Sequence, residues 1–322
     1  KIAIQGRVVC HVNLAKGYRG GERQTELLVQ EMVRLASPYT PCAVLRKNGE
    51  LHKRLTERFP DIPVVLVDTP LGGHLRAYQM LNAALTQAHE ARAVYWCLIH
   101  NLLWTIPYII TRRVQDPLKR KFSTVLGYSR ARSVIAVSTW IKIHIATRLP
   151  KVNPIVIADA SEWKPKTLWT SQSREKEAKY LIHAGAINFA HKGQDIALRV
   201  LQRLPPQFHL SFFGDGPDAE KLKELITEEG LDNRIKLYPW SAFDLTELMR
   251  FDCFIFTSRH EGLGSILIDI MKSGPPVVAA NVGGVPDLIK DYETGRLIQP
   301  GEFFVQNFAT AVVEVSENLG LA

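Results

Sequence analysis

The 322-residue sequence is poor in cysteine and lacks long hydrophobic runs. Its four cysteines (Cys10, Cys42, Cys97 and Cys253) are scattered without a Cys-x-x-Cys pair, which argues against a disulfide framework or a metal site. The most apolar run, residues 98–110, is shorter than the roughly 18 residues that a membrane-spanning helix needs. The first residues read as a strand and not as a secretory signal, so we expect a cytosolic protein.

Acidic residues are scarce in the first half of the chain. Residues 1–165 carry 24 Lys/Arg and 11 Asp/Glu, whereas residues 166–322 carry 16 and 21. Much of the excess lies between Arg112 and Lys151, either as a solvated basic helix surface or as a patch that meets an anionic partner. The patch has no interleaved aromatic residues, so we expect no nucleic acid. An anionic membrane surface or a phosphorylated, lipid-linked acceptor fits better.

Strand-like and helix-like segments alternate along the chain. The strands are short apolar runs, as in a parallel sheet covered on both faces, and the alternation indicates doubly wound α/β units. The expected strands are residues 2–10, 41–45, 63–67, 93–97, 133–137, 153–157, 180–184, 208–213, 235–238, 253–257 and 276–280. The clearest helical patterns are residues 22–36, 194–204, 218–229 and 265–272.

One segment interrupts this alternation. Residues 158–178 have no apolar periodicity and are rich in Lys, Ser, Thr, Glu and Trp, which predicts a linker. The chain is long enough for two domains, and we expect them over residues 1–165 and 166–322, with a boundary near 165–178. Open parallel sheets bind ligands in the loops after their strands, so the chemistry is expected in those loops.

The loop after the expected strand 253–257 is the most informative. It is polar, contains glycine and leads into an apolar helix. The unpaired amides at the start of this helix, around Gly264, Ser265, Ile266 and Leu267, form a site for an anion. Gly262 and Gly264 let the chain approach a phosphate without obstruction by a side chain.

Two carboxylates flank this anion site. Glu261 lies in the loop, and Asp269 lies one helical turn beyond Ser265 on the same face, so each can address one end of a diphosphate ligand. In the alternative interpretation, Glu261 is a charge at a helix start and Asp269 is a solvated helix residue. Asp269 lies among apolar residues and is a poor helix former, which weighs against that alternative.

These residues resemble the signature of the retaining glycosyltransferases of family four. That family's pattern of Glu-x7-Glu, Gly-x-Pro-Val-Val and Gly-Gly-x-Pro-Glu-Ile is similar to Glu261 with Asp269, residues 274–278 and residues 283–289. Residues 291–300 are similar to the family's Gly-x-Leu-Val-x-Pro tail. The resemblance implies a GT-B fold: two Rossmann-like, doubly wound parallel-sheet domains facing across a cleft. The first would bind the acceptor and the second the nucleotide sugar.

Three further loops of the second half agree with this resemblance. Residues 185–193, which include Asn188, resemble the loop whose Lys-Gly end reaches the donor diphosphate through Lys192. A surface lysine at a helix start is the alternative for Lys192. The two other loops supply Gly214 and Gly216 of a Gly-x-Gly-Pro turn, and Tyr238 and Trp240 of the loop where the family holds its nucleotide base. Domain packing explains Trp240 equally well.

The first half matches the family less closely. Residues 17–23 follow the first strand and contain Gly20 and Gly21, like the family's Gly-Gly loop that faces the diphosphate and acceptor. They lack the Gly-x-Gly-x-x-Gly spacing of a dinucleotide fingerprint. His100 follows the expected strand 93–97, where the family often places a histidine near the donor sugar. A structural histidine is an equal alternative.

The resemblance implies a nucleotide-sugar-dependent, hexosyl-type transferase that retains anomeric configuration. Lys192, Arg259 and the amides of residues 264–267 would stabilise the leaving nucleoside diphosphate. Glu261 would hold donor sugar hydroxyls, Asp269 the ribose hydroxyls, and His100 the reacting sugar. The chain has no Asp-x-Asp motif, so we expect no bound metal and no cofactor.

The expected partners follow from the same resemblance together with the charge pattern. The donor would be a UDP-, GDP- or ADP-linked sugar, and the acceptor a saccharide or lipid-linked molecule of bacterial surface polysaccharide or lipopolysaccharide synthesis. The basic region from Arg112 to Lys151 would contact an anionic membrane, which places the protein at the inner face of the cytoplasmic membrane.

Three departures from the family pattern leave alternatives open. Asp269 replaces the second glutamate, Ala186 or His191 stands where an arginine usually accompanies the lysine, and residues 158–163 replace an Asn-Gly-Val-Asp turn. One alternative is a nucleotide-sugar epimerase of the same fold. Another is a degenerate homologue that binds a nucleotide sugar without catalysis.

Overall fold

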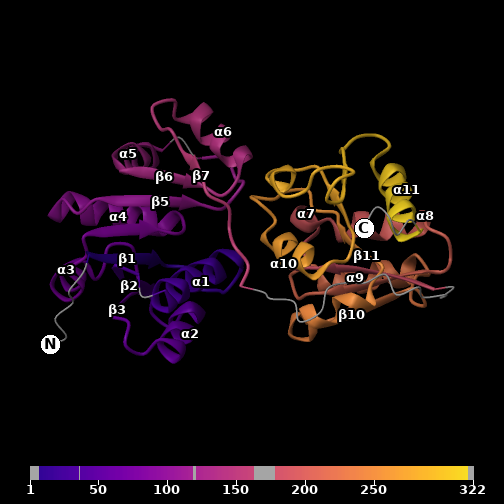
Figure 1. Ribbon diagram of the computed structural model, residues 1–322, viewed down its shortest axis with the longest axis horizontal. Coiled ribbons are helices and arrows are strands. Elements are labelled where there is room, and N and C mark those ends of the chain that lie inside the picture. The colour runs from indigo at the N-terminus through magenta and orange to yellow at the C-terminus, as the bar shows by residue number, and fades with distance from the viewer. Residues whose placement is uncertain (1–6, 36, 119–120, 163–177, 318–322) are drawn as a thin grey trace. The chain divides into compact units, whose positions relative to one another are not determined.

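The computed structural model divides into two compact units, Lys1–Ala160 and Ser161–Ala322 (Figure 1). It describes residues 7–35, 37–118, 121–162 and 178–317. The boundary expected near residues 165–178 falls almost wholly on residues outside this description, as do the first five residues of the expected strand 2–10.

The first unit is built on a seven-stranded parallel sheet in the order β3-β2-β1-β4-β5-β6-β7. The order reverses between β1 and β4, which is the switch point where ligands of such sheets bind. Its strands are β1 (Arg7–Asn13), β2 (Tyr39–Arg46), β3 (Val64–Val67), β4 (Leu85–Ala88), β5 (Tyr108–Arg112), β6 (Ser133–Ala136) and β7 (Ile155–Val156). Its helices are α1 (Gly20–Arg34), α2 (Glu50–Arg58), α3 (His74–Leu81), α4 (Ala91–Trp104), α5 (Phe122–Arg130) and α6 (Thr139–Arg148).

The second unit repeats this topology with six parallel strands in the order β10-β9-β8-β11-β12-β13. Its strands are β8 (Lys179–Ala184), β9 (Phe208–Phe213), β10 (Ile235–Tyr238), β11 (Cys253–Phe256), β12 (Val277–Ala280) and β13 (Arg296–Ile298). Its α-helices are α7 (Phe189–Lys192), α8 (Gln194–Arg203), α9 (Ala219–Glu228), α10 (Ser265–Ser273) and α11 (Phe304–Glu317). Three short 3₁₀ helices are η1 (Trp240–Ala242), η2 (Leu245–Arg250) and η3 (Val285–Asp287).

The second sheet is buried on both faces. Leu181 of β8 and Ile255 of β11 pack into one core together with residues of α8, α9 and α11. Their neighbours in sequence, Ile182 and Phe254, pack into a second core together with residues of α10. Because side chains alternate along a strand, a sheet covered by helices on both faces needs continuous apolar strands. This explains why the strands β8 to β12 were readily predicted.

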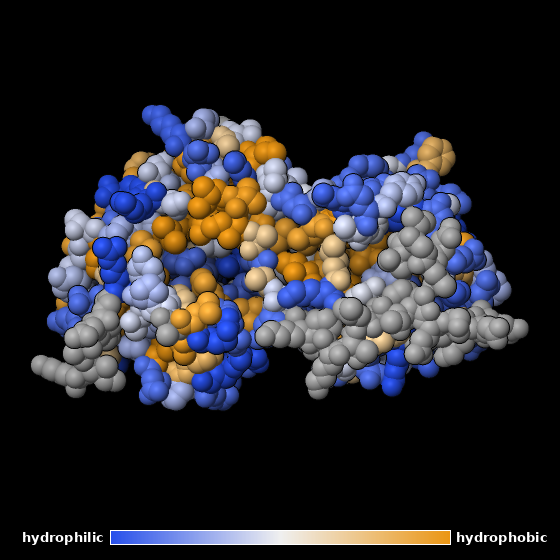
Figure 2. All heavy atoms as spheres, viewed as in Figure 1, coloured by the Kyte–Doolittle hydropathy of each residue, from blue (hydrophilic) through white to orange (hydrophobic). Residues whose placement is uncertain are grey.

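Some large hydrophobic side chains stay on the surface. Figure 2 shows groups of hydrophobic residues among hydrophilic ones on one face of the molecule. In the first unit, exposed hydrophobic residues include Leu71, Leu75, Leu102, Leu103 and Phe122. Among the described residues, no helix is long and apolar enough to cross a membrane.

One strand prediction in the first half was wrong, because residues 93–97 lie inside α4. Glu90 caps this helix, and its carboxylate accepts hydrogen bonds from the amides of Arg92 (2.6 Å) and Ala93 (2.7 Å). An apolar run of this length does not distinguish a buried strand from a buried helix.

The true strands on either side, β4 and β5, were not predicted. β4 carries the polar residues Thr86 and Gln87 in the core, where Gln87 Nε2 donates to Thr111 Oγ1 (2.9 Å). Residue 111 lies in β5, so a buried hydrogen bond between neighbouring strands takes the place of apolar packing. β13 was also missed, and the other expected strands each coincide with a strand of the structure.

Gly193 joins the loops that follow β8 and β11. Its φ is +64°, and a Cβ atom at this position would lie 2.3 Å from the carbonyl oxygen of Thr257. The Thr257 hydroxyl donates to the Gly193 carbonyl oxygen (2.9 Å). Only glycine allows both this left-handed conformation and this close approach.

We expect Gly193→Ala to destabilise the second unit more than Gly230→Ala does. Gly230 has almost the same φ, +65°, but a Cβ atom there would meet nothing within 4 Å. Gly230→Ala should therefore cost only the backbone strain, about 1–2 kcal/mol, while Gly193→Ala should cost a further ~1–3 kcal/mol from the collision. Thermal unfolding of the two variants measures this difference. Equal melting temperatures would contradict it.

Candidate functional site

The predicted donor-binding residues of the second unit gather at one edge of its sheet. Lys192 follows β8, Gly214 follows β9, Tyr238 ends β10, and Glu261 follows β11. These four strands are neighbours in the order β10-β9-β8-β11. Since all are parallel, their carboxyl ends meet at the same edge, where ligands of open α/β sheets bind.

Lys192 and Glu261 form an ion pair at this edge. The Lys192 ammonium donates to Glu261 Oε1, which also accepts a hydrogen bond from Ser258 Oγ (2.9 Å). The Lys192 side chain keeps 25% of its surface exposed and the Glu261 side chain 9%. Lys192 Nζ also lies 5.6 Å from the centroid of the Phe256 ring. A lysine held in this way is not a freely solvated surface residue.

His183, in β8, is a buried neighbour of Lys192. Burial together with the positive charge of Lys192 lowers the pKa of His183 to about 4. The histidine is therefore neutral at pH 7 and adds no competing charge.

The helix that follows Glu261 begins as predicted. Gly264 is the N-cap of α10, with a φ of +84°, so Ser265, Ile266 and Leu267 form its first turn. The Gly284 amide donates to the carbonyl oxygen of Glu261 (3.3 Å), which fixes the Glu261 loop against the turn after β12. Gly262 lies in the same loop. The Leu267 amide, predicted to be unpaired, donates to the carbonyl oxygen of Gly264 (2.8 Å). The start of a helix nevertheless favours an anion.

Asp269 is buried one turn inside α10. It is 3% exposed, which excludes a solvated helix residue. Its Oδ1 accepts a hydrogen bond from Ser161 Oγ, and Lys272 Nζ donates to the Ser161 carbonyl oxygen (3.1 Å). Ser161 belongs to the second unit, so the chain enters this unit directly beside the second predicted carboxylate.

Arg259 braces the Lys192 loop. Its guanidinium donates to both carboxylate oxygens of Asp195 (2.6 and 2.7 Å) and to the carbonyl oxygen of Phe189 (2.6 Å). Burial opposes ionisation of Asp195, but the hydrogen bonds and charge of Arg259 outweigh it and lower the pKa of this carboxyl. Arg259 therefore connects the starts of α7 and α8 in this structure, and its contact with a diphosphate stays a prediction.

The residues predicted in the loops after β8 and β9 determine how the backbones of these loops pack. A Cβ atom at Gly214 would lie 2.0 Å from the Gly185 carbonyl oxygen, and one at Gly216 would lie 2.1 Å from that of Ile187. These glycines let the loops after β8 and β9 pack closely. Asn188 caps α7, and its side chain accepts a hydrogen bond from the His191 amide (3.1 Å).

Aromatic rings line the loop after β10. Tyr238 stacks on Phe213 with ring centroids 4.7 Å apart, and Trp240 stacks on Phe243 at 5.0 Å. The Trp240 amide donates to Asp215 Oδ2 (2.9 Å). Trp240 remains 46% exposed, so its packing leaves a flat aromatic surface open to solvent.

In the first unit, the structure separates the predicted residues. Gly20 and Gly21 begin α1 directly after the β1 loop, at the carboxyl edge of the sheet. His100 lies inside α4, where it stacks on Trp96 with centroids 4.6 Å apart and is 2% exposed. It does not follow a strand, and the structure does not place it with the strand-end residues.

Sequence reasoning missed two residues at this edge, His89 and Arg113. His89 directly follows β4, and Arg113 directly follows β5. Both were overlooked because neither strand was predicted. The hydrogen bond between Gln87 and Thr111 that stabilises these two strands is not revealed by sequence periodicity.

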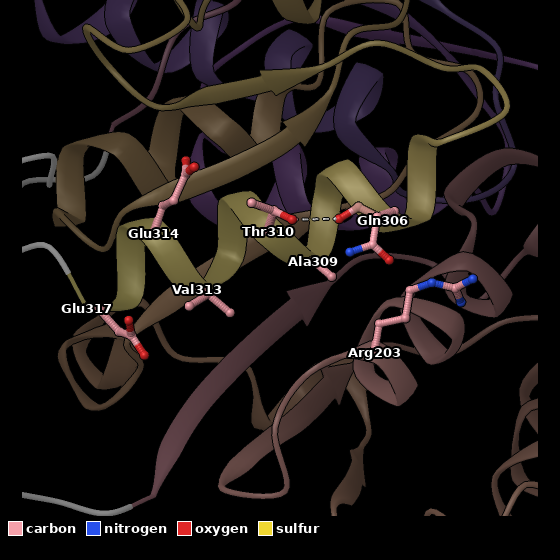
Figure 3. A pocket seen from close by; sticks show the side chains of 7 residues that line it. All are labelled: Arg203, Gln306, Ala309, Thr310, Val313, Glu314 and Glu317. Carbon is pink, nitrogen blue, oxygen red and sulfur yellow. Dashed lines mark hydrogen bonds between the residues drawn. The ribbon is translucent and has the colours of Figure 1, made fainter.

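A shallow pocket lies between α8 and α11, away from these loops (Figure 3). It is lined by Arg203, Gln306, Ala309, Thr310, Val313, Glu314 and Glu317. Glu314 is already paired with Arg296 of β13. The lining contains no predicted donor residue, so this pocket is separate from the candidate site. Among the described residues, no group of three or more His, Cys, Asp or Glu side chains is arranged to hold a metal ion.

We expect His100→Phe to weaken the pH dependence of stability. Burial, with a smaller effect of His74, lowers the pKa of His100 to about 4 from 6.5. Between pH 6.5 and pH 4, this histidine is therefore protonated in the unfolded chain and neutral in the folded chain. The free energy of unfolding consequently falls as the pH is lowered through this range. Phenylalanine keeps a ring in the stack but does not titrate. Urea unfolding between pH 7 and pH 4 should show a smaller loss for the variant, and an equal loss would contradict a neutral His100.

Comparison with known proteins agrees with this geometry. Residues 166–319 match the family model of the glycosyl transferases group 1. The sulfoquinovosyl transferase SQD2 of Arabidopsis thaliana is 34% identical over 132 residues, which are 40% of this chain and 25% of the relative. The lipopolysaccharide core biosynthesis glycosyltransferase LpsE of Rhizobium meliloti is 28% identical over 124 residues, 38% of this chain and 36% of the relative. The matches thus span well under half the length of these relatives.

The likeness to solved structures covers both units. Anabaena Alr3699/HepE, solved in complex with UDP and glucose, has a TM-score of 0.78 at 22% identity, over 98% of this chain and 91% of that chain. At this identity the likeness shows the fold alone. The predicted α/β fold of GT-B type, with two Rossmann-like parallel-sheet units, is confirmed, and the second half of the chain is similar to group 1 glycosyltransferases.

Proposed function

We propose that the protein is a glycosyltransferase that moves a hexosyl group from a nucleotide-diphosphate sugar with retention and without a bound metal. The observation that supports this most strongly is the Lys192–Glu261 ion pair beside the first turn of α10. It combines a cation, a carboxylate and oriented helix amides at the carboxyl edge of the sheet. The match of residues 166–319 to the group 1 family supports the same reaction.

The leaving group of such a reaction is a nucleoside diphosphate, so catalysis consists mainly of stabilising its developing charge. Lys192 and the backbone amides at the start of α10, before Leu267, supply that stabilisation. In the structure Lys192 is neutralised by Glu261. Binding of the donor separates the pair, so that Lys192 turns to the phosphates and Glu261 accepts hydrogen bonds from the sugar hydroxyls. Ser258 holds Glu261 during this exchange.

The remaining parts of the donor have candidate contacts in the same unit. Asp269 is a buried carboxylate one turn into α10 and accepts the ribose hydroxyls. Tyr238 and the half-exposed Trp240 flank the place of the base. Alr3699/HepE was solved with UDP and glucose, which favours a UDP-sugar over GDP- or ADP-sugars as the first donor to test.

We further propose a saccharide or lipid-linked acceptor of bacterial surface polysaccharide synthesis. The relative LpsE acts in lipopolysaccharide core biosynthesis, which supports this class. The basic region from Arg112 to Lys151 is proposed to contact the inner face of the cytoplasmic membrane. Exposed hydrophobic side chains of the first unit, such as Leu102 and Phe122, suit such an interface.

Donor binding should raise the melting temperature. A ligand present at 100 times its dissociation constant stabilises the folded protein by about 2.7 kcal/mol. We expect one of UDP, GDP or ADP, or its sugar, to give a shift that a chelator does not reduce. Absence of any shift would favour the degenerate homologue, and a shift that a chelator removes would contradict metal independence.

Glu261→Ala should lower transfer by about 100-fold or more, because it removes the carboxylate that orients the donor sugar. Glu261→Gln should be nearly as impaired, since the amide keeps a partner for Ser258 but loses the charge. Glu220→Ala is the matched control, because Glu220 pairs with Lys223 at 2.8 Å on the exposed surface of the same unit.

Product analysis separates the alternatives. Release of nucleoside diphosphate in the absence of any acceptor would indicate the epimerase. Near-native transfer by Glu261→Ala would refute the assignment of this site.

A further inference from the structure

A buried chain of polar side chains crosses the carboxyl edge of the first sheet. It involves His11 of β1, His89 after β4 and Arg113 after β5. His89 Nε2 lies 3.1 Å from His11 Nδ1, and Arg113 Nη1 lies 3.2 Å from His89 Nδ1. Both histidines are buried, at 1% and 3% exposure. The transferase proposal leaves this cluster unused.

The charge of Arg113 determines the tautomers along the chain. A guanidinium only donates, so His89 Nδ1 must be an acceptor and the proton of neutral His89 must sit on Nε2. His89 Nε2 then donates to His11 Nδ1, and the His11 proton sits on Nε2, 3.3 Å from Met32 Sδ. Burial and the charge of Arg113 keep the pKa of His11 at about 4, which agrees with two neutral rings.

Arg113 is thus held from two sides. His89 accepts from Nη1, and Asp159 Oδ1 accepts from Nε at 3.0 Å. In the part of the chain that the structure describes, Arg113 Nη2 has no hydrogen-bond partner. The Arg113 side chain keeps 13% of its surface exposed, so it is not fully enclosed by protein.

The start of α1 lies beside the Arg113 side chain. A Cβ atom at Gly21 would lie 3.8 Å from Arg113 Cδ, and one at Gly20 would meet nothing within 4 Å. Gly20 and Gly21 are also the first residues of α1, whose amides favour an anion. The loop before them adds the exposed cations Lys16 and Arg19.

We propose that Arg113 binds a phosphate group of a substrate at the carboxyl edge of the first sheet, and that His89 and His11 are neutral positioning residues for its guanidinium. A planar guanidinium with a fixed orientation suits the paired oxygens of a phosphate better than a mobile point charge does. The phosphate comes either from the donor diphosphate or from a phosphorylated acceptor. The histidines act through Arg113 and do not touch the substrate.

Inorganic pyrophosphate is the first probe, because it carries the phosphate chemistry without a sugar or base. Arg113→Met keeps an unbranched side chain but removes every donor, and it should weaken pyrophosphate binding by about tenfold or more. Arg76→Met is the matched control, because Arg76 is an exposed arginine of α3 in the same unit. Isothermal titration of the full chain measures both. Unchanged affinity in Arg113→Met overturns the proposal.

Two His89 variants test the positioning role. Asparagine places an amide oxygen near Nδ1, so His89→Asn should preserve the acceptor for Arg113 and most of the affinity. Glutamine reaches instead toward Nε2, so His89→Gln should weaken binding nearly as much as Arg113→Met does. Equal losses in both variants would refute the positioning role. Nitrogen-15 NMR of the wild-type protein should show His11 and His89 protonated at Nε2, and protonation at Nδ1 would also refute it.

Two further probes identify the source of the phosphate. If UDP affinity depends on Arg113, the phosphate belongs to the donor; if glycerol 3-phosphate affinity does, it belongs to the acceptor. These measurements need no sugar transfer. A wild-type chain that transfers no sugar but binds pyrophosphate through Arg113 would refute the proposed function and leave this inference standing. Normal sugar transfer by the wild-type chain, together with unchanged pyrophosphate affinity in Arg113→Met, would support the proposed function and refute this inference.

Discussion

The close approach of Gly193 to the carbonyl oxygen of Thr257 organises the candidate site of the second unit. Lys192 directly precedes this glycine, and the loop with Ser258 and Glu261 directly follows Thr257. The contact therefore brings the ends of β8 and β11 together and places a lysine beside a carboxylate. Without it, the ammonium and the carboxylate would be carried on two independent loops. The contact also explains why the lysine is followed by glycine.

Ion pairs then hold the charges of this site in a partly buried environment. Lys192 pairs with Glu261, and Arg259 pairs with Asp195 through two parallel hydrogen bonds. An unpaired charge here would be costly, because burial removes its hydration. The two pairs differ in what they leave available. Arg259 makes three hydrogen bonds that brace α7 and α8. The Lys192 ammonium makes one ion pair, which a ligand with its own charges can replace.

Much of the second unit could be predicted from the sequence, because the residues that indicate its structure lie close together in the chain. The loop after β11 carries its glycines, its carboxylate and its helix start within a few residues, and β11 and β12 are apolar runs buried on both faces. Trp240 and Gly214 were placed correctly at strand ends, although Gly214 turned out to serve loop packing.

The first unit was harder because part of its core is polar. Gln87 and Thr111 satisfy each other between neighbouring strands, and this contact depends on residues far apart in the sequence. Because β4 and β5 were not predicted, His100 was expected in a loop after a strand. Its actual place in an aromatic stack follows from tertiary packing. For the same reason, His89 and Arg113 were not predicted as site residues. They belong to a chain of hydrogen bonds that forms only in the folded sheet.

The short outer strands of both sheets have a consequence for aggregation. β7 has two residues and β13 three, while β3 and β10 have four each. An edge strand of this length offers few backbone groups to a foreign chain, which is one way in which natural sheets avoid edge-to-edge association. Ile155 and Val156 of β7 can therefore remain about half exposed, at 48% and 41%, without making that edge a template for a growing fibril.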